Sequence, residues 1–375
     1  MNSRERQLAI LNGEPPDRIP WAPRLDIWYN ARLATGTMPA KWQGWSLRDI
    51  QHDLGCDDPA KQGQIVAVHY EGVEIVQKAE DGLTFTEYHT PVGSVRRASG
   101  HSETLRSQGM GGRVQQNLLN GPADYRVWEW VMEHAVWEPT YDAYRSYDAE
   151  VGGDGLPIVQ FDYCDAPFHW FLLHGAGYGD GFYQLHDYPA EVEHLLAVMT
   201  EVQRARNWPV LAESPARVLL HGVHHSSAFT PPPLYEKYIL PYYQEFIPLM
   251  HDHGKAVALH ADNDVSAIAP LIERAGYDMV ECFVTAPMVP LTLERAREVW
   301  GTRVIIHGGL PSLLLAPSVN EEEFRAYVDR LFDIIAPGEA FILGVSDNVM
   351  PDSLIDRVAW VSEVVEERGW YPIGG

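Results

Sequence analysis

Imidazole and carboxylate side chains recur at the ends of short apolar runs in the second half of the chain. Such side chains can bind a divalent cation together and leave coordination positions open for a substrate. His260 and Asp262 are two residues apart, so on an extended backbone they face the same side. The pattern indicates a metal site with four expected ligands: His260, Asp262, Glu281 and Asp347.

Each of these residues also has a structural interpretation. A single histidine at a strand end is commonly a hydrogen-bonded structural residue, and either Asp262 or Asp347 could cap the helix that follows it. Glu281 could pair with an arginine from a neighbouring loop, and the adjacent Cys282 is expected to be a small buried hydrophobic residue. Their recurrence at successive strand ends favours a functional site.

The elements that position these residues are expected to be parallel strands. From about residue 217 onward, short apolar runs alternate with segments of helical period. The runs are 217–223, 255–260, 278–283, 303–307 and 340–345. They are apolar on both faces, as parallel strands are when both faces of their sheet are covered. Between them, Asn320 before three glutamates predicts a helix start, and Gly276 predicts a helix end.

Further strands are expected at 18–22 and 157–161 and within 65–77. About eight strands alternating with helices predict an α/β fold, a closed (β/α)8 TIM barrel, as a single domain over 1–375. No Gly-x-Gly-x-x-Gly follows a strand, which argues against a dinucleotide-binding sheet. The region of about 64–120 departs from the alternation and predicts an inserted β-hairpin, which either lines the substrate pocket or decorates the barrel edge.

The barrel prediction adds further residues to the candidate site, because activity resides at the carboxyl ends of barrel strands. Arg24 and Asp26 follow the first expected strand, and His224 follows the fourth. Aromatic residues after the third strand, such as Tyr163 and Trp170, would suit a flat or aromatic substrate.

Composition narrows the classes of partner. The chain has 28 Lys and Arg against 52 Asp and Glu, a formal net charge of −24, which disfavours nucleic acids and anionic membrane surfaces as partners. No apolar run approaches the length of a membrane span. Three cysteines are too few for a disulfide framework, so we expect a cytoplasmic protein. With nucleic acids and membranes disfavoured, the expected partner is a small molecule. The sequence is compatible with a homodimer.

Four segments resemble the uroporphyrinogen decarboxylase-like superfamily, which includes corrinoid-linked methyltransferases. They are residues 4–20, with Leu-Asn-Gly-Glu-Pro-Pro-Asp-Arg-Ile-Pro at 11–20, residues 234–243 (Leu-Tyr-Glu-Lys-Tyr-Ile-Leu-Pro-Tyr-Tyr), the strand that ends at His260, and residues 344–352. The resemblance spans nearly the whole chain and implies a (β/α)8 barrel.

Two departures from the family pattern bear on function. Uroporphyrinogen decarboxylases have an Arg-Gln-Ala-Gly-Arg loop that grips the substrate carboxylates, whereas residues 23–28 here hold one arginine, so haem synthesis is not expected. The methyltransferase branch holds zinc with His-x-Cys and a second Cys. The matching positions here are His260, Asp262 and Asp347. Carboxylates in place of thiolates make a harder, more Lewis-acidic site.

The resemblance and this ligand set predict a metal-dependent methyl- or alkyltransferase that acts on an oxygen-bearing small molecule. It would be an O-demethylase component that hands the methyl group to a corrinoid, which arrives free or on a separate protein. Zinc is the first choice of metal, with manganese or iron as alternatives, and His307 or His224 would donate a proton to the leaving oxygen. A metal-free decarboxylase using Arg24 and Asp26, and a non-catalytic cofactor-binding barrel, are the alternative hypotheses.

Overall fold

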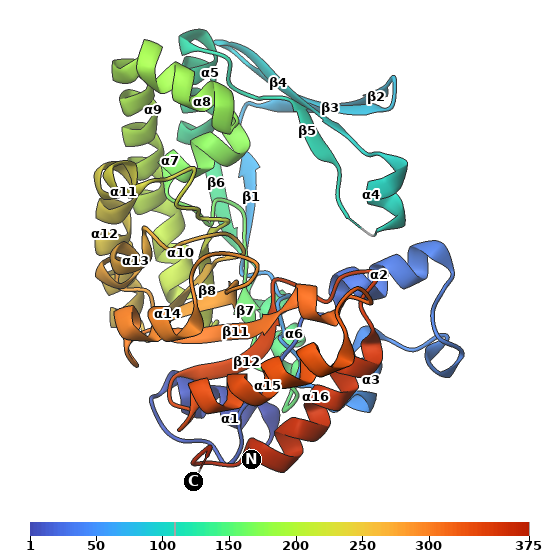
Figure 1. Cartoon of the computed structure of the whole chain (residues 1–375). Coiled ribbons are helices and arrows are strands. Elements are labelled where there is room, and N and C mark those ends of the chain that lie inside the picture. Colours follow the sequence, from blue (N-terminus) through green and yellow to red (C-terminus); the bar gives the residue numbers. More distant parts are fainter. Residues whose placement is uncertain (109, 375) are drawn as a thin grey trace.

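A curled parallel sheet lies at the centre of the fold, with its strands in the order β12-β11-β10-β9-β8-β7 (Figure 1). The structure is a computed structural model that describes residues 1–108 and 110–374. The strands are β7 (Ile158–Val159), β8 (Val218–Val223), β9 (Ala256–His260), β10 (Met279–Phe283), β11 (Ile305–Pro311) and β12 (Phe341–Ser346). All of their residues are buried, which explains why these runs are apolar on both faces.

Two extended segments link the edges of this sheet. Trp21 forms a parallel bridge with Leu343 of β12, and its carbonyl accepts a hydrogen bond from the N–H of Asp57 at 2.7 Å. The N–H of Ile158 in β7 donates to the carbonyl of Ala60 at 3.0 Å. The sheet therefore has six strands where about eight were predicted. The segments at Trp21 and at residues 57–60 lie in the other two expected positions and make only isolated backbone bridges or hydrogen bonds.

The prediction that the second barrel strand lies within 65–77 is wrong. That segment forms β1 (Val66–Tyr70), which pairs antiparallel with β6 (Ala135–Pro139), and the start of β2 (Glu74–Glu80). Residues 57–60 (Asp-Asp-Pro-Ala) take its place beside Trp21. Aspartate and proline are poor strand formers, so local propensity gave no signal there.

The predicted antiparallel hairpin is present as part of a four-stranded sheet, β2-β3-β4-β5, which projects away from the parallel sheet at the top of Figure 1. Its strands are β2 (Glu74–Glu80), β3 (Leu83–Thr90), β4 (Gly93–Gly100) and β5 (Arg113–Gln116). Asp81 and Gly82 both have positive φ, 50° and 76°, as a two-residue hairpin turn requires. Tyr88 of β3 meets Trp128 edge to face, with ring centroids 5.2 Å apart.

Helices cover the parallel sheet, with α12, α13 and α14 along its left flank in Figure 1, while α9 lies above them beside α5 and α8. Their bounds are α1 (Ser3–Leu11), α2 (Asp26–Thr35), α3 (Leu47–Asp53), α4 (Glu103–Ser107), α5 (Pro122–Glu133), α6 (Tyr141–Val151), α7 (Pro167–Trp170), α8 (Tyr178–Asp187), α9 (Pro189–Val202), α10 (Trp208–Glu213), α11 (Pro232–Leu234), α12 (Leu240–Asp252), α13 (Ala269–Ala275), α14 (Leu293–Trp300), α15 (Glu321–Ile335) and α16 (Ile355–Arg368). Within residues 1–108 and 110–374, no helix is both long and apolar enough to cross a membrane.

The helix boundaries settle two alternatives for the candidate site residues. Asn320 caps α15 and Gly276 ends α13 in a left-handed conformation, both as predicted. The N-cap of α13, however, is Ile268, and that of α16 is Leu354. Asp262 and Asp347 therefore cap neither helix, and both remain available at the strand ends.

Candidate functional site

Three candidate residues converge at the carboxyl ends of β8 and β9. One ligand atom from each of His224, His260 and Asp262 lies within 4.8 Å of the others. Asp262 Oδ2 lies 2.7 Å from His224 Nδ1 and 3.6 Å from His260 Nε2. Burial raises the pKa of Asp262, but the hydrogen bonds with the two imidazoles outweigh burial and lower it below its usual value. The carboxylate is therefore ionised and ready to act as a ligand.

Glu281 contacts the other nitrogen of the His260 ring. Its Oε2 lies 2.6 Å from His260 Nδ1, and its side chain is 1% exposed. Carboxylates commonly hold metal-binding histidines in this way, through the ring nitrogen that faces away from the metal. The structure thus separates the expected ligands into Asp262 on the Nε2 side of His260 and Glu281 on the Nδ1 side.

Lys61 completes this arrangement and was not found by sequence reasoning. Its ammonium lies 2.6 Å from Glu281 Oε2 and 3.3 Å from His260 Nδ1, and its side chain is only 12% exposed. Burial raises the pKa of Glu281, but Lys61 and His260 outweigh burial and hold it well below its usual value. Glu281 was expected to pair with an arginine if its role were structural; its cationic partner is this lysine. Lys61 follows the segment without strand propensity, so nothing in the local sequence marked it.

Asp347 and Cys282 lie beside these residues. Burial and the neighbouring Asp262 carboxylate raise the pKa of Asp347. Cys282 is buried, as expected, but its Sγ has polar neighbours: Glu281 Oε1 at 3.0 Å and the main-chain carbonyl of Asp347 at 3.2 Å. The Asp262 carboxylate after β9 and the Asp347 carboxylate after β12 repel each other, which costs free energy unless a cation lies near both.

Arg24 and Asp26 pair with each other, with Nη2 and Oδ2 3.3 Å apart. The other terminal nitrogen of Arg24 lies 3.2 Å from Cys282 Sγ. These two contacts use one N–H on each terminal nitrogen, and within the described residues Arg24 Nε has no partner, so the guanidinium keeps N–H groups that are not engaged.

His307 stands apart from the converging imidazoles. It is buried in β11, its Nε2 lies 3.2 Å from the carbonyl oxygen of Ala22, and burial lowers its pKa. Among the described residues, two groups of converging ligand atoms contain His260, one with His224 and Asp262 and one with Glu281 and Cys282, and His307 belongs to neither.

The neighbouring Gly308 is part of β11. A Cβ there would lie 2.7 Å from the carbonyl oxygen of Phe283, so glycine permits the close approach of β10.

Backbone strain concentrates at the same end of the sheet. Four non-glycine residues at or just past strand ends have φ between 56° and 66°: Tyr163, His224, Cys282 and Asp347. Such conformations cost energy and persist only where the surrounding structure imposes them, which is common at active sites. They turn the chain sharply at the positions that hold the candidate residues.

A cavity of about 480 Å³ opens beside this cluster and shares His224 with it. Its walls include Tyr70 of β1, Tyr88 of β3 and Arg97 of β4, so the antiparallel region lines the pocket. Trp128 and Trp170 stack with ring centroids 5.2 Å apart and form part of the wall. The hydroxyls of Tyr70 and Tyr163 lie 2.7 Å apart, and burial raises the pKa of both phenols.

A larger cavity of about 740 Å³ lies at the opposite end of the sheet, where its lining includes Asp278, Ile305 and Ala340 at the starts of strands. None of the candidate site residues lines it. Enzymes with barrel folds carry their active sites at the carboxyl ends of the strands, so the smaller cavity is the candidate substrate site.

Comparison with known proteins identifies the family. The family model for uroporphyrinogen decarboxylase (URO-D) matches residues 109–368. The chain belongs to the uroporphyrinogen decarboxylase family. A methyltransferase from Methanosarcina mazei has a similar structure, with a TM-score of 0.57 and 15% sequence identity over 98% of this chain and 99% of that one. At that identity the likeness shows the shared fold. No curated protein gives a significant match to the sequence.

Membership of the URO-D family supports an enzyme. His224, His260, Asp262 and Glu281 lie within the matched residues. Lys61 and the cavity residues of β1, β3 and β4 lie N-terminal to them. The candidate metal cluster and most of the cavity wall thus belong to the matched region, while Val68, Tyr70, Tyr88 and Arg97 add a part of the wall from outside it.

Proposed function

We propose that this URO-D family member is a metal-dependent methyl- or alkyltransferase that acts on an aromatic, oxygen-bearing small molecule. The observation that carries the proposal is the position of His224. It is both a member of the His224, His260 and Asp262 cluster and a lining residue of the aromatic cavity. A substrate in the cavity would therefore lie next to the proposed metal.

The donor types suit a zinc-class ion. Ligands about 2.1 Å from a tetrahedral ion are about 3.4 Å apart, close to the 3.6 Å between His260 Nε2 and Asp262 Oδ2. The 2.7 Å between His224 Nδ1 and Asp262 Oδ2 is a hydrogen-bond distance, which a bound ion would have to widen. Three protein ligands leave a position for substrate, and Asp347 is the nearest further carboxylate candidate. A bound metal would supply a Lewis acid that polarises the substrate oxygen. Glu281 and Lys61 would keep His260 oriented and its Nδ1 engaged.

The cavity wall suggests the substrate class. Stacked and edge-on aromatic rings favour a flat ring in the cavity. Arg97 lines the same cavity from β4 and would pair with an anionic substituent such as a carboxylate. Tyr70 and Tyr163 share one hydrogen bond, so one of their two O–H groups remains to donate to the leaving oxygen. This role replaces the one expected for His307, which bonds to the backbone.

The methyl acceptor is proposed to be a reduced corrinoid supplied by a separate protein. In that reaction the bond between the aryl oxygen and the methyl carbon breaks, a bond between that carbon and the corrinoid cobalt forms, and the oxygen leaves with the bonding electrons. The cavity must then open to a partner large enough to carry the corrinoid.

A metal-free decarboxylase is the second candidate, and the family description favours it. Arg97, which lines the aromatic cavity, would then bind the carboxylate that is lost.

Elemental analysis and a transfer assay separate the two functions. Protein purified without a metal-affinity tag is expected to contain a divalent metal. The His260→Ala variant is expected to lose one equivalent of that metal. It should also lose the transfer of methyl groups from methoxylated aromatic acids to cob(I)alamin. His221→Gln is the matched control, because His221 is also buried but bonds to the hydroxyls of Tyr242 and Tyr243. Full activity after chelation, with release of CO2 from an aromatic acid, would support the decarboxylase instead.

A further inference from the structure

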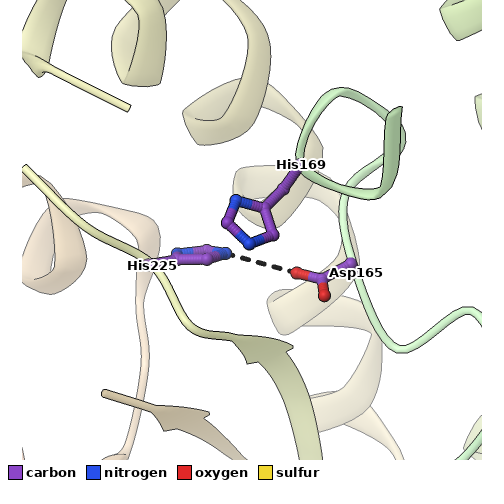
Figure 2. Close-up of side chains that lie close together, drawn as sticks. All are labelled: Asp165, His169 and His225. Carbon is purple, nitrogen blue, oxygen red and sulfur yellow. Dashed lines mark hydrogen bonds and ion pairs between the residues drawn. The ribbon is translucent and has the colours of Figure 1, made fainter. Parts of the chain in front are cut away.

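A second cluster of possible metal ligands lies outside the site described above. Figure 2 shows the imidazoles of His169 and His225 and the carboxylate of Asp165 pointing toward one another. Asp165 follows β7, His169 lies in α7 and His225 follows β8. The three residues are 2%, 0% and 0% exposed, and one ligand atom from each lies within 4.8 Å of the others.

Most polar atoms of this cluster lack a hydrogen-bond partner. Asp165 Oδ1 lies 3.3 Å from His225 Nε2 and accepts a bond from the N–H of Val223 at 3.3 Å. Within the part of the chain that the structure describes, Asp165 Oδ2, both ring nitrogens of His169 and Nδ1 of His225 have no partner. Buried polar side chains in native proteins are nearly always paired, so four unpaired atoms at one point indicate a missing ligand.

The neighbouring side chains do not bond to these four atoms in the described part of the chain. His169 and His225 face each other with ring centroids 4.4 Å apart, and aromatic rings surround them. Tyr235, whose ring meets His225 edge-on, has an unpaired hydroxyl of its own. Over residues 1–108 and 110–374, no side chain bonds to Asp165 Oδ2.

We propose that Asp165, His169 and His225 bind a second divalent cation of the zinc class. Two imidazoles and one carboxylate are a common zinc ligand set, and three protein ligands leave one position for water or substrate. The 3.3 Å between Asp165 Oδ1 and His225 Nε2 matches the separation of about 3.4 Å for two ligands of one tetrahedral ion. Asp165 also lines the aromatic cavity, which gives the ion a path from solvent.

An ion bound by these three residues would also affect the wall of the aromatic cavity. It would join α7 to the end of β8, and Trp170, the residue after His169, lies in the cavity wall. The cation would therefore fix the wall against which the substrate stacks. The inference is independent of the proposed function, because the two clusters share no residue.

Metal stoichiometry of the full-length protein tests the site. Wild-type protein is expected to bind two equivalents of zinc, His169→Gln one, and the double variant His169→Gln/His260→Ala none. His221→Gln, which alters a buried imidazole with its own hydroxyl partners, should keep two. If His169→Gln keeps the wild-type stoichiometry, the cluster holds water and the proposal is wrong. If His169→Gln lowers the metal content but His260→Ala leaves it unchanged, the second site stands and the metal of the proposed function does not.

A Co²⁺ titration of the wild-type protein tests the second site even if the variants do not fold. Metal-free protein titrated with Co²⁺ is expected to develop visible absorption bands over two equivalents, and excess Zn²⁺ should remove both. Saturation at one equivalent, with a spectrum that His169→Gln does not change, would overturn the proposal. Far-ultraviolet circular dichroism of each variant shows whether it is folded.

Discussion

Removal of one charge from the buried Lys61–Glu281 pair is expected to destabilise the protein by about 3 to 4 kcal/mol. The two charged atoms are 2.6 Å apart, with side chains 12% and 1% exposed. At an effective dielectric constant of about 20, a pair at this distance attracts by about 6 kcal/mol before desolvation is subtracted. Lys61→Met leaves the Glu281 carboxylate buried with His260 and the Cys282 thiol as its remaining partners, and Glu281→Gln leaves the ammonium without its counter-charge.

The double variant Lys61→Met/Glu281→Gln should be less destabilised than the sum of the two single variants. It buries no unpaired charge, so we expect a coupling energy of about 2 kcal/mol or more. Urea unfolding of metal-free protein gives the free energies, with chelator present throughout so that loss of a bound metal does not add to the difference.

A surface pair of the same chemistry provides the control. Lys237 and Glu193 are 2.7 Å apart but 59% and 46% exposed, so the same three variants there should show a coupling below about 1 kcal/mol. Equal coupling energies for the two pairs would refute the reasoning, because burial would then have no effect on the interaction.

Three further predictions concern the surface, the cavity and the sheet. The hydrogen bond to Asp278 raises the pKa of His251, so this pair stabilises the fold below about pH 6.5. Its contribution to the free energy of unfolding is under about 1 kcal/mol, because the groups are exposed, and it is lost as pH rises through the folded pKa. His251→Gln should therefore make the free energy of unfolding depend less on pH in that range. Arg97→Met should raise KM for anionic aromatic substrates by about 10- to 100-fold, while Arg96→Met should not. Gly308→Ala should cost about 2 kcal/mol or more in urea unfolding.

Each of these has a matched outcome that would contradict it. His253→Gln, an exposed imidazole bonded to a main-chain carbonyl, should leave the pH profile unchanged, and equal flattening would refute the role of Asp278. Equal changes in KM for the uncharged methyl ester of the substrate would remove Arg97 from substrate binding. Gly179→Ala, where a Cβ meets nothing within 4 Å, should be neutral, and a Gly308→Ala variant as stable as this control would contradict the close approach.

Sequence patterns identified the parallel strands from β8 to β12 well because each is buried on both faces and therefore uniformly apolar. The residues at their ends could be listed for the same reason. Sequence patterns did not predict the extended segment at residues 57–60, because it has no strand propensity. Backbone hydrogen bonds with Trp21 and Ile158 hold it extended. Lys61 was missed together with that segment.

The amino-acid sequence by itself determined which segments are buried strands, where α13 ends and α15 begins, and that imidazoles and carboxylates stand at one end of the sheet. These properties follow from local periodicity and chain direction. Tertiary structure alone decided that Asp262 meets Nε2 of His260 while Glu281 meets Nδ1, that Lys61 neutralises Glu281, and that the antiparallel strands wall the cavity. Those contacts join residues distant in the chain, so side-chain packing, rather than any local pattern, fixes which atoms meet.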